Sequence, residues 1–183
     1  MLHLYPEAEL VEGCQREQAD YQRALYKQYY RKMYAICLRY TDNSDDAQDI
    51  LQEGFIKVFK HIKKFLSQGS LEGWIRRIMI HTSIEHYRRK SRYFMVDINE
   101  AKGIELNTDA LSNLSRNEIL MLVQKLPAGY RTVFNLYAIE GYSHKEISLM
   151  LNISIGTSKS QLSRAKGLLR SQIGQMDLKA TGC

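Results

Sequence analysis

Proline, cysteine and long apolar runs are all scarce in this chain, and each absence narrows what it can be. Two prolines among 183 residues, with little strand-like alternation, favour an all-α fold. The three cysteines are odd in number and lack CxxC spacing, so they indicate neither a disulfide framework nor a zinc site. No apolar run approaches the ~20 residues of a membrane span, and the N-terminus shows no signal-sequence pattern. We therefore expect a cytoplasmic protein.

The composition is that of an ordinary globular protein with a basic bias. Hydrophobic residues make up 44% of the chain and charged residues 25%, so a real core is expected. The length suits one or two small domains. A net charge of +6 permits a polyanionic partner but does not prove one.

Helical periodicity predicts four helices in the first half, at residues 6–13, 19–40, 44–66 and 71–90. Ser44 is the expected N-cap of the third helix, with Asp45 and Asp46 in a first turn where the helix dipole favours anions. The apolar stripe of this third helix is predicted to be buried, and it comprises Ala47, Leu51, Phe55, Val58, Ile62 and Phe65.

The second half begins after a stretch without periodicity at residues 92–112, which predicts a linker between two domains. Ser115 and Glu118 match a capping box that opens the next helix. Pro127 ends that helix and begins another, which is expected over residues 128–139.

The stretch from Gly141 to Arg170 reads as two helices around a tight break. Ser143 and Glu146 form a second capping box at the start of the first helix. Residues 152–154 interrupt the pattern, and Ser154 can cap the longer helix that follows. This arrangement predicts a helix-turn-helix.

The second of these helices has a polar face suited to DNA. It carries Lys, Arg, Ser, Thr and Gln side chains and no acidic residue, and the face comprises Thr157, Lys159, Ser160, Gln161, Ser163, Arg164 and Lys166. A helix fits the major groove, where such side chains contact phosphates and base edges. The alternative is a helical hairpin whose polar face is only solvated.

Acidic residues are gathered on one face of the third helix, because Asp45, Asp49 and Glu53 recur every four residues. Three interpretations are open from the residues alone. The face can be solvated at a helix N-terminus, can dock a basic partner, or can bind a metal through carboxylates. No histidine joins the face, which counts against the metal.

Basic residues are concentrated between residues 57 and 92, a stretch that contains ten Lys and Arg but only two Glu. Trp74, His81, His86 and Tyr87 are interleaved with them. Basic residues beside stackable rings suit single-stranded nucleic acid. A solvated basic helix with a buried Trp explains the same pattern.

Both halves carry family-specific residues in a fixed order. In the second half they are Leu126-Pro127, Arg131, Val133-Phe134, Gly141-Tyr142-Ser143, Glu146-Ile147, Leu151, Ile153-Ser154, Gly156-Thr157, Lys159-Ser160, Leu162 and Arg164-Ala165. In the first half they are Asp46-Ala47, Asp49-Ile50, Gln52-Glu53, Phe55, Val58, Phe65, Trp74-Ile75, Arg77-Ile78 and Arg88-Arg89. The chain thus resembles bacterial sigma factors of the sigma-70 family, in the extracytoplasmic-function (ECF) group.

The resemblance implies two helical domains. Region 2 would span residues 1–91 and region 4 residues 113–175, with the linker at 92–112 and a tail at 176–183. It also implies three surfaces. Core RNA polymerase would be contacted by Asp45, Asp46, Asp49, Gln52 and Glu53. Unpaired bases of the -10 element would be bound by Gln68, Trp74, Arg77, His81, Arg88 and Arg89. The -35 duplex would be read by Thr157, Ser158, Lys159, Ser160, Ser163 and Arg164.

The chain departs from the family pattern at His81, where Asn is frequent, and at Ser158 and Ser148, where apolar and Ala residues are usual. The difference at His81 leaves the -10 sequence preference open. Ser148 and Ser158 lie where the two helices of the helix-turn-helix are expected to pack together.

No cofactor, metal or catalytic residue is implied, since polymerisation belongs to the partner. The implied partners are RNA polymerase core, promoter DNA and a membrane-bound anti-sigma factor, which the group commonly has. Two rivals remain, a stand-alone repressor using the same helix-turn-helix and a carboxylate metal hydrolase.

Overall fold

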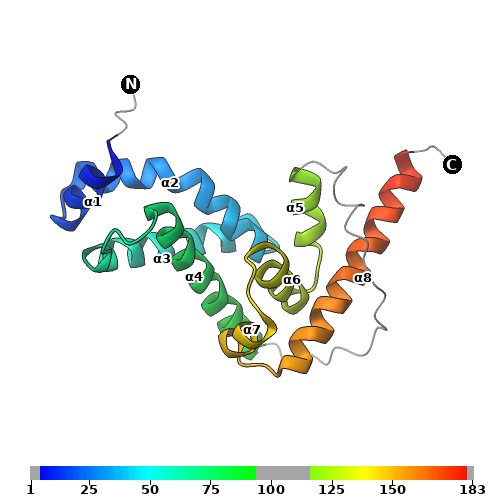
Figure 1. Cartoon of the computed structure of the whole chain (residues 1–183). Coiled ribbons are helices and arrows are strands. Elements are labelled where there is room, and N and C mark those ends of the chain that lie inside the picture. The colour runs from blue at the N-terminus through cyan, green and yellow to red at the C-terminus, as the bar shows by residue number, and fades with distance from the viewer. Residues whose placement is uncertain (1–4, 94–115, 181–183) are drawn as a thin grey trace. The chain divides into compact units, whose positions relative to one another are not determined.

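The computed structural model describes residues 5–93 and 116–180, and the side chains of residues 5–90 and 118–175. Within those ranges every regular element is helical, which confirms the all-α expectation (Figure 1). The described chain divides into two compact units. One lies within residues 1–38 and 43–86, and the other within residues 39–42 and from 87 onward.

The first unit is built from four α-helices and a short 3-10 turn, of which α2 and α4 have their last residues in the second unit. In chain order these are α1 (Glu7–Gln15), α2 (Ala19–Tyr40), α3 (Ser44–His61), η1 (Ile62–Lys64) and α4 (Leu71–Tyr93). Their inner faces meet in a core whose largest fully buried side chains include Leu25, Met33, Leu51, Ile75 and Met79. The predicted stripe of α3 and η1 is buried in full, from Ala47 to Phe65.

Polar contacts fix the ends of α1 in this unit. The side-chain amide of Gln15 donates to the carbonyl oxygens of Ile62 at 3.2 Å and Phe65 at 3.3 Å. The backbone N–H of Leu71 donates to Glu7 Oε1 at 3.2 Å. These contacts hold the chain on both sides of the loop between η1 and α4.

The N-cap predicted for α3 is wrong by one residue. Asn43, not Ser44, has the extended backbone of an N-cap, and its Oδ1 accepts a hydrogen bond from Asp46 N at 2.8 Å. Asn and Ser are about equally good caps, so the sequence did not distinguish two adjacent candidates. The helix itself ends at His61, and its expected last turn is the 3-10 turn η1.

The second unit contains the expected helix-turn-helix. Its elements are α5 (Arg116–Gln124), α6 (Ala128–Phe134), the π-helical turn η3 (Asn135–Ile139), α7 (His144–Leu151) and α8 (Ile155–Ala180). The helix expected over 128–139 therefore changes to π geometry at Asn135, where Glu140 N donates to Asn135 O at 3.0 Å.

The last helix is longer than predicted. Its buried stripe of Leu162, Ala165 and Leu169 continues to Ile173, and helix extends into the predicted tail as far as Ala180. The linker prediction and the capping box at Ser115 lie largely outside the described residues.

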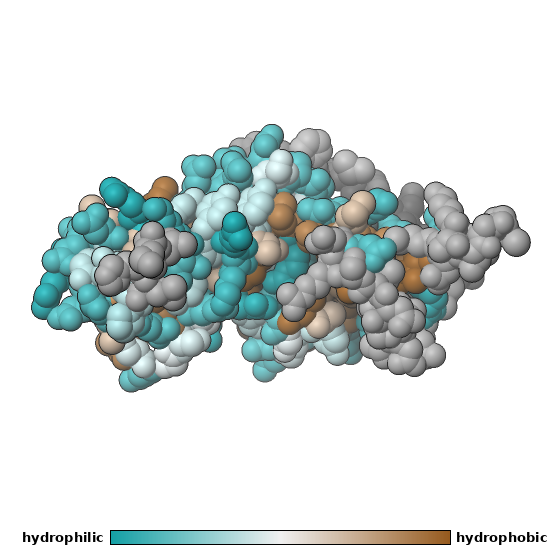
Figure 2. All heavy atoms as spheres, turned by 90° about the horizontal axis from the view of Figure 1, so that it is seen from above, coloured by the Kyte–Doolittle hydropathy of each residue, from teal (hydrophilic) through white to brown (hydrophobic). Residues whose placement is uncertain are grey.

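None of the described helices is long and apolar enough to cross a membrane. No group of three or more His, Cys, Asp or Glu side chains in the described part is placed to hold a metal ion. On the face shown in Figure 2, hydrophilic colours dominate and the brown spheres show only in small groups.

Candidate nucleic-acid and polymerase interfaces

The helix-turn-helix is set by local hydrogen bonds at its two starts. At α7, Glu146 N donates to Ser143 Oγ at 3.3 Å while Ser143 N donates to Glu146 Oε2 at 2.8 Å, which confirms the capping box. At α8, Thr157 N donates to Ser154 Oγ at 2.9 Å. Between the two helices Asn152 takes the left-handed conformation, with φ of 55°, and ends α7. Asn tolerates this conformation better than most residues, so the turn is encoded locally.

Basic and hydroxyl side chains line the outer face of α8 in its first three turns. Lys159 and Ser160 are exposed, while Thr157, Ser163 and Arg164 are half-buried. The guanidinium Nη1 of Arg164 lies 3.4 Å from the hydroxyl of Tyr130 on α6, a long contact. A face of this kind can meet a phosphate backbone and base edges.

Ser158 does not belong to that face, and the expectation that it contacts DNA is corrected here. Its side chain is completely buried, and its Oγ lies 2.9 Å from Nδ1 of His144. The His144 ring in turn stacks on Tyr137 with centroids 4.5 Å apart. Ser158 precedes Leu162 by one helical turn and continues the buried stripe, so its spacing was the available signal.

The surroundings of His144 favour its neutral form. Burial lowers the pKa of His144, and the positive charges of Lys159 and Lys166 lower it further. The neutral ring has one nitrogen that donates and one that accepts a hydrogen bond, and the Ser158 hydroxyl can pair with either.

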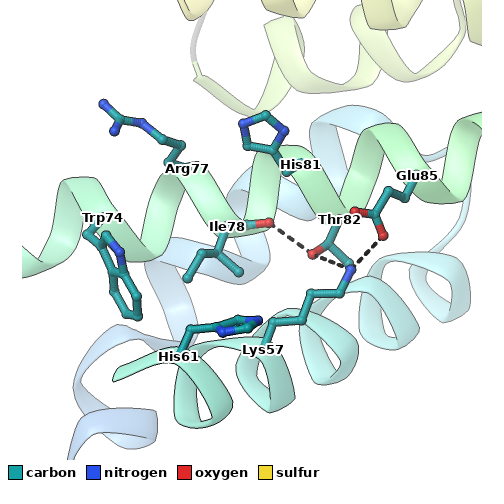
Figure 3. Close-up of a pocket in the computed structure, with 8 residues that line it drawn as sticks. All are labelled: Lys57, His61, Trp74, Arg77, Ile78, His81, Thr82 and Glu85. Carbon is teal, nitrogen blue, oxygen red and sulfur yellow. Dashed lines mark hydrogen bonds and ion pairs between the residues drawn. The ribbon is translucent and has the colours of Figure 1, made fainter. Parts of the chain in front are cut away.

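A pocket of about 240 Å³ opens between α3 and α4 in the first unit. Its lining comprises Lys57, His61, Trp74, Arg77, Ile78, His81, Thr82 and Glu85. Figure 3 shows Trp74, Ile78 and Thr82 pointing from α4 toward His61 and Lys57 on α3, whereas Arg77 and His81 extend away from α3 and form the outer edge. The structure thus brings Trp74, Arg77 and His81 together, as expected for one site.

The α3 side of this pocket was missed from the sequence. Lys57 Nζ lies 2.7 Å from Glu85 Oε2, 2.9 Å from Glu53 Oε1 and 3.3 Å from Thr82 Oγ1. Burial would lower the pKa of Lys57, but the hydrogen bonds to Glu85 and Glu53 outweigh it and raise the pKa. Lys57 is therefore charged and ties α3 to α4 at the inner end of the pocket. Nothing in its local sequence distinguishes it from the lysines that follow.

The other predicted -10 residues lie outside this pocket. Gln68 is exposed in the loop between η1 and α4, where Ser67 and Gly69 have φ of 56° and 112°. Arg88 and Arg89 lie on later turns of α4 and do not line the pocket. Trp74 packs against Phe65 with centroids 5.3 Å apart, which anchors the base of that loop.

The acidic residues of α3 divide between two faces. Asp45, Asp49 and Gln52 are exposed. Asp46 is half-buried, with Oδ1 3.7 Å from His86 Nε2, and Glu53 is bound to Lys57. Asp45 and Asp49 therefore form an open acidic surface, with the neutral Gln52 one turn beyond.

Comparison with known proteins finds two matching families along the chain. Residues 25–93 match the family described as Sigma-70 region 2, and residues 116–169 match Sigma-70, region 4. The ECF RNA polymerase sigma factor SigW of Bacillus subtilis is 33% identical over 159 residues, which cover 79% of this chain and 84% of that protein. The chain belongs to the ECF group of the sigma-70 family. As a sigma factor it is a transcription initiation factor, which binds RNA polymerase core and promoter DNA.

Two further likenesses extend over most of this sigma factor. The RNA polymerase sigma-H factor of Pseudomonas aeruginosa is 28% identical and covers 91% of this chain and 93% of its own length. A solved structure of CnrH in complex with the cytosolic domain of CnrY is 18% identical, with a TM-score of 0.49, and covers 92% of this chain and 97% of that one.

Proposed function

We propose that this sigma factor reads the -35 element with the outer face of α8 and captures unpaired -10 bases at the pocket between α3 and α4. We also propose that Asp45, Asp49 and Gln52 dock region 2 on RNA polymerase core. The observation that carries the proposal is the pocket, because it joins an aromatic and apolar wall to a cationic edge in the matched region 2.

The pocket chemistry suits an unpaired base. Trp74, Ile78 and His61 supply flat or apolar surface, on which any base can stack. Arg77 and His81 at the outer edge are exposed, where they can meet the phosphate backbone or a neighbouring base. Taking a base out of a duplex costs a few kcal/mol, and these contacts offset that cost.

The -35 contacts come from a smaller set than the sequence implied. Lys159, Ser160, Ser163 and Arg164, with Thr157 at the first turn, remain as candidates after Ser158 is removed. Lys159 and Arg164 supply the salt-dependent attraction to phosphates. Arg164 can also read a guanine with two hydrogen bonds if it leaves the long contact with Tyr130.

Each domain alone has one small DNA-binding surface, so we expect the free protein to bind promoter duplex weakly. A partner that fixes the spacing of the two domains converts the second contact into an intramolecular event and raises the overall affinity. RNA polymerase core serves as that partner in this proposal. An anti-sigma factor remains a prediction from the group, to be tested by co-purification.

Permanganate footprinting of unpaired thymines tests the proposal, on a promoter that this factor transcribes in vitro with core. We expect reactive thymines in the -10 element only when factor and core are both present. Arg77→Ala and His81→Ala should reduce this reactivity, while Arg23→Ala, which removes an exposed arginine of α2, should not. Tight, specific duplex binding by the factor alone, without opening on addition of core, would favour a repressor.

A further inference from the structure

An isoleucine interrupts the polar residues on the exposed face of α3. Ile56 is 67% exposed, although the helix buries Phe55 and Val58 on its other side. Asp45, Asp49, Gln52, Ile56 and Lys60 follow one another at steps of three or four residues, so they form one stripe along the helix. All five are exposed. We call this set the α3 stripe.

The stripe is distinct from the side of α3 that faces α4. Glu53 and Lys57, beside it, are bound to each other and to Glu85. Within the described part of the chain, no ion pair engages Asp49 or Lys60. The charges of the stripe are therefore available to a partner, while those beside it already serve the pocket.

The order of side chains along the stripe defines the chemistry of that partner. Two carboxylates lie at the N-terminal end, Gln52 follows, and Ile56 and Lys60 lie one turn apart toward the C-terminal end. Carboxylates at this position repel nucleic acid, so charge complementarity selects a protein surface with basic groups opposite Asp45 and Asp49. A few side chains that become fully desolvated in an interface carry most of its binding energy, and Ile56 is the large apolar side chain of the stripe.

We infer that Ile56 is the apolar anchor of the docking surface for RNA polymerase core, inserted in an apolar depression that is flanked by basic groups. This inference rests on the proposed docking by Asp45, Asp49 and Gln52, and adds the residue that supplies affinity. The acidic residues then steer and orient the approach, and their effect falls as salt rises.

Binding of the full chain to core polymerase without DNA tests the inference, at low and high salt. Ile56→Ala should weaken binding about tenfold, a loss that persists at high salt because burial of apolar surface is not screened. Asp49→Lys should weaken binding mainly at low salt. Leu66→Ala is the matched control, since Leu66 is 74% exposed in the same unit and loses similar apolar area.

The outcomes separate the anchor from the docking proposal. Normal binding by Ile56→Ala with weakened binding by Asp49→Lys would overturn the anchor and leave the docking surface in place. Normal binding by both variants would overturn both. An equal loss in Leu66→Ala would also overturn the anchor, because the effect would not be specific to the stripe. Ile56→Gln, which keeps a long side chain but removes its apolar character, should repeat the loss without altering the thermal unfolding of the protein.

Discussion

Gly54 controls how closely α3 approaches α4, and replacing it with Ala tests whether this spacing builds the pocket. The glycine is buried in the interior of α3. A Cβ placed there would lie 2.3 Å from Sδ and 2.9 Å from Cε of Met79 on α4. Met79 is completely buried, so it has little room in which to move. We expect α3 and α4 to be pushed apart beside Lys57.

Two opposing terms set the size of the effect. Ala favours a helix interior over Gly by about 1 kcal/mol. Overpacking a well-filled core costs about 1–3 kcal/mol, and the flexibility of Met places this site near the middle of that range. The net expectation is a loss of about 1 kcal/mol. At a typical urea dependence this lowers the midpoint of unfolding by about 0.5 M.

Urea unfolding followed by the fluorescence of Trp74 measures the loss of stability in region 2, where Gly54 lies. Trp74 is the one tryptophan of the chain, and it lies in region 2 beside the pocket. Gly54→Ala should lower the fluorescence midpoint and reduce -10 opening with core. Gly167→Ala on α8 is the control, because its added Cβ meets nothing within 4 Å and should stabilise region 4 by about 1 kcal/mol without changing the Trp74 transition.

A rise in the Trp74 midpoint of Gly54→Ala would refute the reasoning, since it would mean that Met79 moves away freely and only helix propensity remains. The Met79→Ala background provides a second check. There the added Cβ meets no sulfur, so Gly54→Ala should become neutral or stabilising.

Three further outcomes follow from the structure. The pKa of His144 is lowered in the folded protein, so the unfolded chain binds a proton first as the pH falls through 6.5. Region 4 should therefore lose stability between pH 7 and 5.5. In thermal melts, the His144→Gln variant should not show this loss. If Arg164 reads a base, Arg164→Ala should weaken binding to the cognate -35 duplex by about 1–3 kcal/mol. If Arg164 contacts only phosphate, binding to cognate and scrambled duplexes should weaken equally in a competition assay. Burial raises the pKa of the Cys14 thiol to about 11, so iodoacetamide at pH 8 should label Cys14 slowly in the folded protein and rapidly in urea, as mapped by mass spectrometry.

Periodicity and capping patterns were sufficient to predict the helices and their inner faces. The predicted second helix coincides with α2, and the capping box of Ser143 and Glu146 is present because both partners lie within one turn. Side chains on a border between faces were harder to place. Ser158 was assigned to the -35 surface by the family resemblance, yet it is buried and its partner His144 lies 14 residues earlier on another helix.

The same limit applies to the pocket. Lys57 and His61 read as part of a basic run, and only the packing of α3 on α4 gives them a shared cavity with Trp74. Glu53 fell on the acidic face by its spacing, but its ion pair with Lys57 turns it toward α4. Charge reversal at Glu53 would therefore disturb Lys57 and its contact with α4, which makes Asp49 the cleaner position for testing polymerase binding.

Under the proposed function, the two faces of α3 link polymerase docking to base capture in region 2. Gln52 and Ile56 lie on the α3 stripe, while Lys57, one residue beyond Ile56, lines the pocket and is paired with Glu53 and Glu85. Because both faces belong to one rigid helix, a partner that binds the stripe also fixes the position of the pocket. Under the proposed function, the unpaired strand therefore reaches a pocket placed by polymerase itself. Loosening α3 from α4 should impair opening more than it impairs polymerase binding, because the stripe lies on α3 alone.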